Sequence, residues 1–284
     1  MTTKSTTLID ADTLVQRLKE QPPVSVLDCR MRLDDAGAGD RLYRQGHIPG
    51  AVRADLDQRL VDRRTSMTGR HPLPDREALA TAIGEIGVSN SDQVVVYDDQ
   101  GGAMSARLWW MLRWLGHEAV AVLDGGIQAW TAAGGELETA IPTPQPVPFV
   151  AGRPLTEPLS ADGLEDGLRD GRVKLVDVRA AERFRGEHEP FDPVAGHVPG
   201  AANRPFVDNL DADGRFLPVS TLRRMYADLA KSPDQVVCMC GSGITACHTL
   251  LALEHAGVSG ARLYAGSWSE WIRDPERPVA TGEK

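Results

Sequence analysis

The chain has 284 residues, of which 42% are hydrophobic and 25% are charged, a globular composition with room for about two domains. Its net charge of −9 provides no long-range attraction for nucleic acids or acidic membrane surfaces, so we expect neither as a partner. Any anionic substrate must therefore be bound by a local pocket.

No stretch approaches the roughly 20 consecutive apolar residues of a membrane span, and the first residues lack the apolar core of a secretory signal. We expect a soluble, cytoplasmic protein. The cysteines, Cys29, Cys238, Cys240 and Cys247, lack the CxxC spacing of zinc sites and the density of a disulfide scaffold. Each is therefore expected to be a reactive or a buried thiol, without a bound metal.

In the first half of the chain, short β-branched runs alternate with segments of helical periodicity. Strands are predicted at Val24–Leu27 and Gln93–Tyr97, and a helix at Met104–Leu115. Strands separated by helices predict an α/β fold with a mostly parallel sheet flanked by helices on both faces. In such sheets ligands bind beyond the carboxyl ends of the strands, which is where Asp98 lies.

A proline-rich segment then divides the chain. Ile141–Pro158 contains six prolines and little apolar periodicity, which favours an extended and fairly stiff connector. We predict a first domain over residues 1–138, a linker over residues 139–157 and a second domain over residues 158–284.

The second half repeats the pattern of the first. A strand is predicted at Val173–Val176, a second strand ends just before Cys240, and a helix is predicted at Thr245–His255. Cys240 therefore occupies in the second domain the place that Asp98 occupies in the first.

Four sequence matches in the same order indicate that the two halves are copies of one unit. GHIPGA at Gly46–Ala51 recurs as GHVPGA at Gly196–Ala201, VLDCR recurs as LVDVR, SDQVVVYD as PDQVVCMC, and LDGGIQAW as YAGSWSEW. His47 and His197 lie in the duplicated turns. Since the motif is present in both copies, we predict structural roles for these histidines.

The loop after the second-copy strand carries the strongest chemical signal. Cys240 is followed by Gly241-Ser242-Gly243 and then by the start of a helix. Glycines let backbone N–H groups point inward, and a helix N-terminus adds positive partial charge, so the loop is a cradle for anions. This setting favours the nucleophilic thiolate, although a lone cysteine here could also be a packing residue. Cysteine phosphatases need an arginine where Ala246 stands, so phosphoryl transfer is not expected.

Together HIPGA, HVPGA, DGG, GSW and CGSGITAC resemble the tandem rhodanese-type sulfurtransferases, over essentially the whole chain. The resemblance implies two rhodanese-like domains, an inactive first copy and a catalytic second copy with Cys240, and no cofactor. CGSG followed by a β-branched residue and threonine resembles the 3-mercaptopyruvate type. It assigns substrate binding to four loop residues: Gly241, Gly243, Ile244 and Thr245.

The same resemblance implies a cation for the substrate carboxylate. Arg183, in ERFRG, matches the carboxylate-binding arginine, although alone it reads as a surface residue. Many members have a second arginine in an EPR segment, where this chain has Phe191. Arg185 is one candidate to replace it.

A proton relay is also implied by the resemblance. Its members are Ser242 in the loop, His71 in HPLP and Asp57 after HIPGA. Taken singly, either first-copy residue is more often a loop cap or a solvent-facing group.

The expected activity is sulfur transfer from 3-mercaptopyruvate, through a persulfide on Cys240, with release of pyruvate. The acceptor would be a thiol, for example on a thioredoxin-like protein, or cyanide. Two alternatives stay open: a thiosulfate:cyanide sulfurtransferase, since thiosulfate forms the same persulfide, and a non-catalytic sulfur carrier loaded by a partner enzyme.

Overall fold

The computed structural model describes residues 4–20 and 24–283, which form two compact units. The amino-terminal unit comprises the described residues up to Val61 together with Pro74–Leu155 and Ala212–Phe216. The carboxy-terminal unit comprises Asp62–Leu73, Thr156–Asp211 and the described residues from Leu217 onward. The units therefore differ from the predicted bounds of 1–138 and 158–284, because one short segment from each half packs into the unit of the other half.

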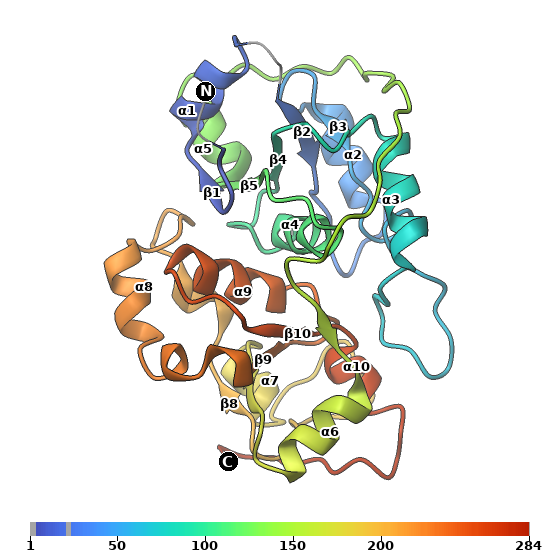
Figure 1. Cartoon of the computed structure of the whole chain (residues 1–284), viewed down its shortest axis with the longest axis vertical. Coiled ribbons are helices and arrows are strands. Elements are labelled where there is room, and N and C mark those ends of the chain that lie inside the picture. The colour runs from blue at the N-terminus through green and yellow to red at the C-terminus, as the bar shows by residue number, and fades with distance from the viewer. Residues whose placement is uncertain (1–3, 21–23, 284) are drawn as a thin grey trace. The chain divides into compact units, whose positions relative to one another are not determined.

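The amino-terminal unit is built on a five-stranded, wholly parallel sheet in the order β1-β5-β4-β2-β3 (Figure 1). Its strands are β1 (Leu8–Ile9), β2 (Ser25–Asp28), β3 (Val52–Arg53), β4 (Val94–Tyr97) and β5 (Val120–Leu123). Its helices are α1 (Ala11–Arg17), α2 (Ala38–Gln45), α3 (Arg76–Glu85), α4 (Ser105–Trp114) and α5 (Gly126–Ala132).

The carboxy-terminal unit repeats this topology, with a parallel sheet in the order β6-β10-β9-β7-β8 (Figure 1). Its strands are β6 (Pro158–Leu159), β7 (Lys174–Asp177), β8 (Ala202–Asn203), β9 (Val236–Met239) and β10 (Arg262–Tyr264). Its α-helices are α6 (Ala161–Arg169), α7 (Ala181–Phe184), α8 (Val219–Met225), α9 (Ala246–His255) and α10 (Ser267–Trp271), and the 3₁₀ turns are η1 (Phe206–Asn209), η2 (Leu229–Lys231) and η3 (Pro233–Gln235). The predicted duplication and α/β fold class are confirmed.

Apolar side chains from alternate strand positions bury each sheet under its helices. In the amino-terminal unit, Val95 of β4 packs with Leu14 of α1 and Trp130 of α5. In the carboxy-terminal unit, Val237 of β9 packs with Leu164 of α6 in the same way. Strands that are covered on both faces form continuous apolar runs, which are easy to recognise in a sequence. The predicted strands therefore differ from the observed ones by one residue at most at either end.

Buried ion pairs link the end of β2 and of β7 to the duplicated GHxPG turns. Arg30 binds the Asp28 carboxylate and donates to the carbonyl of Gly46 at 2.8 Å. In the carboxy-terminal unit, Arg179 binds Asp177 and the carbonyl of Gly196 in the same geometry, also at 2.8 Å. Because both copies keep this arrangement, it belongs to the fold and not to the chemistry.

The two motif histidines have structural roles, as predicted. The His47 ring stacks on Tyr43 with its Nδ1 2.8 Å from the Tyr43 carbonyl, and His197 stacks on Phe184 with Nδ1 2.8 Å from the Phe184 carbonyl. Each ring therefore fixes the turn against the preceding helix.

Up to Leu155 the proline-rich segment forms neither helix nor strand and belongs to the amino-terminal unit, and its last residue, Pro158, begins β6. Its Val147 N–H donates to the carbonyl of Gly84 at 3.0 Å, and its Gly152 N–H donates to the carbonyl of Leu115 at 2.8 Å. Within the described residues, no helix combines the length and the apolar character required to span a bilayer.

Candidate active site

Cys240 lies at the carboxyl end of β9, the central strand of its sheet, where the loop to α9 begins. The thiol is buried, with 2% of the residue exposed, and its Sγ accepts the Gly243 N–H at 3.1 Å. Gly243 has φ of +79°, a conformation that L side chains avoid, and this turns its N–H toward the sulfur. The loop thus presents a backbone donor, the Gly243 N–H, to the Cys240 sulfur, in keeping with the glycine pattern.

The same loop in the amino-terminal unit shows what this backbone binds. There Asp98 follows β4 in the place of Cys240, and its buried carboxylate accepts the Ser105 hydroxyl at 2.9 Å. It also accepts four backbone N–H groups at 2.8 to 2.9 Å, from Gln100, Gly102, Met104 and Ser105. The loop is therefore a cradle for an anion, occupied in this unit by the protein's own carboxylate.

Ser267 supports the cysteine from the neighbouring strand end, and its role is not evident from the sequence. Its Oγ accepts the Cys240 N–H at 3.1 Å and donates to the Tyr264 carbonyl at 2.9 Å. It is the only non-glycine residue with positive φ (53°) in the described part of the chain. The matching residue in the first copy is Gly126, at φ of +59°, so the GG-to-GS change in the repeat was the available signal.

Ser267 offers a test of the strain at this position. We expect Ser267→Gly to be more stable than Ser267→Ala by about 1 kcal/mol, because both lose the hydroxyl but only alanine keeps a Cβ in the left-handed region. Urea denaturation of the two variants measures this difference. Equal stability, or a more stable alanine variant, would show that the backbone at this position is unstrained.

The segment Asp62–Leu73 places His71 in the same unit as Cys240. The Arg70 N–H donates to Ser269 Oγ at 3.0 Å, and Gly69 lies so close to the Gly266 carbonyl that a Cβ would be 2.5 Å from it. His71 itself is buried, with 7% exposed. Asp57, in contrast, belongs to the amino-terminal unit, where its N–H donates to Asp55 Oδ1 at 3.0 Å.

Two arginines lie over the first glycine of the loop. A Cβ built on Gly241 would be 2.9 Å from Arg70 Nη2 and 3.1 Å from Arg183 Nη2. The sequence predicts Arg183 as the residue that binds the substrate carboxylate. It gives no indication of Arg70, because the residues that Arg70 contacts are far away in sequence. Both side chains stay partly accessible, at 21% and 16% exposed.

Buried acids form ion pairs with both arginines. Arg183 donates through Nε and Nη2 to Glu189, at 3.1 and 2.7 Å, and Arg70 Nη1 is ion-paired with Asp192. The ring of Phe191 lies under both guanidinium groups, with its centroid 5.1 Å from Arg183 Cζ and 5.6 Å from Arg70 Cζ. A cation–π contact is therefore present at Phe191, where the family pattern predicts a second arginine.

Arg185, the sequence-based candidate for the missing cation, lies elsewhere. Its guanidinium forms a two-point ion pair with Glu187 at 2.7 and 2.8 Å, and the carboxylate of that pair is largely exposed. We therefore assign the second cation next to Gly241 to Arg70.

The remaining loop residues enclose the cysteine. Ser242 and Ile244 are buried, with 3% and 2% exposed, and Thr245 is partly exposed. Cys247 donates its thiol to the Gly243 carbonyl at 3.3 Å and so braces the loop from α9. Burial, reinforced by the Cys247 and Cys240 thiols, raises the pKa of Cys238, which suits a packed thiol and not a nucleophile.

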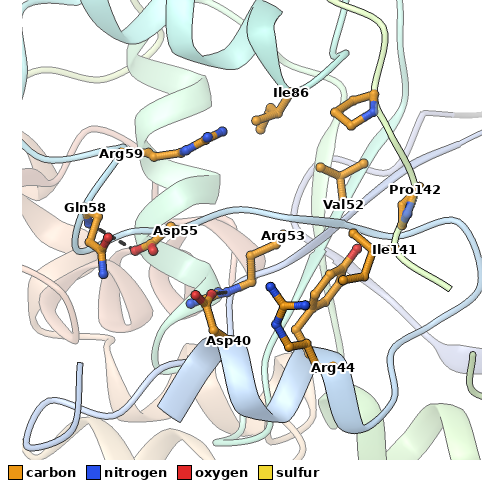
Figure 2. Close-up of a pocket in the computed structure, with 12 residues that line it drawn as sticks. Asp40, Arg44, Val52, Arg53, Asp55, Gln58, Arg59, Ile86, Ile141 and Pro142 are labelled. Atoms are coloured by element: carbon orange, nitrogen blue, oxygen red, sulfur yellow. Dashed lines mark hydrogen bonds and ion pairs between the residues drawn. The ribbon is translucent and has the colours of Figure 1, made fainter. Parts of the chain in front are cut away.

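A surface hollow of about 450 Å³ in the amino-terminal unit lacks reactive side chains like those near Cys240. Figure 2 shows Arg53 next to Asp40, with which it forms an ion pair, and Arg44, Val52 and Ile86 among the other lining residues. No thiol or histidine lines it, and none of the predicted site residues does. Nor do the described residues contain a cluster of three or more His, Cys, Asp or Glu suited to a metal ion.

Comparison with known proteins assigns the chain to a family. The family model of the rhodanese-like domain matches residues 10–133 and again residues 160–274. The chain is 48% identical to a probable 3-mercaptopyruvate sulfurtransferase of Pseudomonas aeruginosa, over 98% of this chain and 99% of the relative. It is 41% identical to a protein of Mycobacterium tuberculosis provisionally named thiosulfate sulfurtransferase SseB, over 99% of both.

A solved structure agrees with these sequence matches. The 3-mercaptopyruvate sulfurtransferase SseA of Escherichia coli superposes with a TM-score of 0.80 and 31% identity, covering 94% of this chain and 100% of that one. The likeness therefore extends over both copies of the repeat.

Proposed function

Because the chain belongs to the rhodanese-like family, we propose that it is a sulfurtransferase that takes sulfur from 3-mercaptopyruvate, through a Cys240 persulfide, and releases pyruvate. The observation that carries the proposal is the position of a thiol in an anion cradle. In the first copy this cradle binds a carboxylate through four N–H groups, and in the second copy Cys240 takes the carboxylate's place. The Gly243 N–H that meets Cys240 Sγ suits a thiolate and the anionic persulfide formed from it.

The choice of donor follows from where the cations lie. The loop residues Gly241-Ser242-Gly243 carry no charge, and the two arginines approach from outside the loop at Gly241. A donor whose carboxylate is separated from its reacting sulfur fits this division. In 3-mercaptopyruvate the carboxylate would reach Arg70 and Arg183 while the sulfur meets Cys240.

The sulfur transfer itself is a displacement at sulfur. The Cys240 thiolate attacks the sulfur of the donor, an S–S bond forms, and the C–S bond breaks with its electron pair on the carbon. That carbanion is the enolate of pyruvate, and it takes up the proton that the donor thiol loses. The products are pyruvate and the anionic persulfide, with no net oxidation.

We propose Ser242 and His71 as the groups that move this proton, since both belong to the unit of Cys240 and both are buried. Asp57 is proposed as the third member of the relay on the family pattern alone. The persulfide is then cleared by a thiolate or by cyanide, which takes the outer sulfur and restores the Cys240 thiolate. A thioredoxin-like protein is the proposed physiological acceptor.

Thiosulfate is a second candidate donor, and one observation favours it. The mycobacterial relative, named for thiosulfate, is 41% identical over nearly the whole chain. Thiosulfate would load the same cysteine and release sulfite, so Cys240 chemistry does not distinguish the two donors.

Steady-state kinetics with both donors and cyanide as common acceptor test the proposal. We expect kcat/KM for 3-mercaptopyruvate, measured by pyruvate release, to exceed that for thiosulfate, measured by thiocyanate, by at least about tenfold. A preference for thiosulfate would replace the proposed donor. Activity with neither donor, together with a Cys240 persulfide formed from a partner enzyme, would favour a sulfur carrier.

A further inference from the structure

The arginine cluster beside Cys240 is electrically balanced by buried acids. Glu189 and Asp192 are 2% and 3% exposed, and Asp177 is fully buried. Three positive and three negative side chains thus form one connected group: Arg70, Arg179, Arg183, Asp177, Glu189 and Asp192. A donor that enters next to Gly241 therefore meets two guanidinium groups whose charge is already compensated.

Asp192 is the acid placed to act on both arginines. One of its oxygens is ion-paired with Arg70 Nη1, and the other, Oδ2, lies 4.0 Å from Arg183 Nη2. Oδ2 is buried and accepts no hydrogen bond from the described residues. The negative charge of Asp192 therefore lies next to both guanidinium groups, and it repels a second anion bound to the same pair of arginines.

We propose that Asp192 is a specificity-determining residue, which makes the anion site beside Cys240 favour singly charged over doubly charged sulfur donors. The proposal rests on the proposed function, in that it explains how a site with two arginines discriminates against thiosulfate. Asp192 needs no contact with the reacting atoms, because it acts through the field at the guanidinium pair.

The size of the effect scales with the charge of the ligand. Coulomb energy is proportional to that charge, so the logarithm of the effect on a dianion is twice that on a monoanion. If removing the Asp192 charge raises the binding affinity for a monoanion about threefold, it raises the affinity for a dianion about tenfold.

The variant that tests this is Asp192→Asn, which keeps the shape of the side chain and an oxygen acceptor for Arg70. We expect KM for thiosulfate to fall about tenfold and KM for 3-mercaptopyruvate about threefold, with kcat nearly unchanged for both. Asp192→Glu keeps the charge and should retain the wild-type ratio. Glu187→Gln removes a carboxylate from the exposed pair with Arg185 and is the matched control, with no effect expected on either KM.

Binding can be measured without turnover, which separates this proposal from the proposed function. Iodoacetamide is neutral and alkylates Cys240, and anions that occupy the arginine site should protect it. At constant ionic strength, Asp192→Asn should lower the half-protecting concentration of sulfate about tenfold and that of pyruvate about threefold. This result would support charge selection even if the enzyme used another donor.

Two outcomes would overturn the proposal. One is that Asp192→Asn changes KM, or the half-protecting concentration, by the same factor for the monoanion and the dianion, or raises KM for both. Either result would show that Asp192 only packs against Arg70. The other applies if that variant does not fold. In that case the wild-type protein decides. If the half-protecting concentration of sulfate is more than about tenfold lower than that of pyruvate, the site favours dianions despite Asp192.

Discussion

Replacing Cys240 with serine is expected to abolish sulfur transfer from either donor, by at least about 10⁴-fold in kcat. The hydroxyl would fit the loop and accept the Gly243 N–H, but it is far less nucleophilic than a thiolate and forms no persulfide. Pyruvate release and intact mass spectrometry after donor treatment, which detects one added sulfur atom, measure the loss.

Cys247→Ser is the matched control for this substitution. Cys247 is fully buried and donates to the Gly243 carbonyl at 3.3 Å, a bond that a serine hydroxyl can also make. We expect most of the activity to remain. If Cys247→Ser removed turnover while Cys240→Ser kept it, the nucleophile would be Cys247.

Replacing either arginine over Gly241 with glutamine is expected to lower kcat/KM for 3-mercaptopyruvate by about 10- to 100-fold. Each guanidinium is proposed to donate a charge-assisted hydrogen bond to the donor carboxylate, and loss of such a bond costs about 1.5–3 kcal/mol. The effect of Arg70→Gln should equal that of Arg183→Gln within this range, since both nitrogens lie about equally close to Gly241.

Arg185→Gln tests whether Arg70 or Arg185 is the second cation that binds the donor carboxylate. Arg185 is paired with Glu187, so its removal should leave kcat/KM within about twofold of the wild-type value. Arg70→Lys is a second control, since it keeps a positive charge for Asp192 but loses the two-pronged geometry. A large loss with Arg185→Gln and none with Arg70→Gln would assign the second cation to Arg185 after all. Urea denaturation of each variant checks that the fold is kept.

The sequence alone determined the fold, its duplication and the position of Cys240, the proposed nucleophile. These features are local: a buried strand, a glycine turn and a helix start follow one another within about a dozen residues, and each has its own residue preferences. The repeat then supplied an internal comparison, in which Asp98 stands opposite Cys240 and the motif histidines occur in both copies. Arg183 followed from the family pattern for the same reason, because that pattern is continuous in sequence.

Only the tertiary structure decided which residues surround Cys240. In sequence Arg70 lies between β3 and α3 of the first copy, yet Asp62–Leu73 packs into the carboxy-terminal unit, where Arg70 meets Asp192 and Gly241. No local pattern specifies such a contact, because it depends on the path of a segment without regular secondary structure. The loss of an arginine at Phe191 was visible in the sequence. The position of Arg70 beside Gly241 was not, since contacts between charged groups in a folded site are made through space and not along the chain.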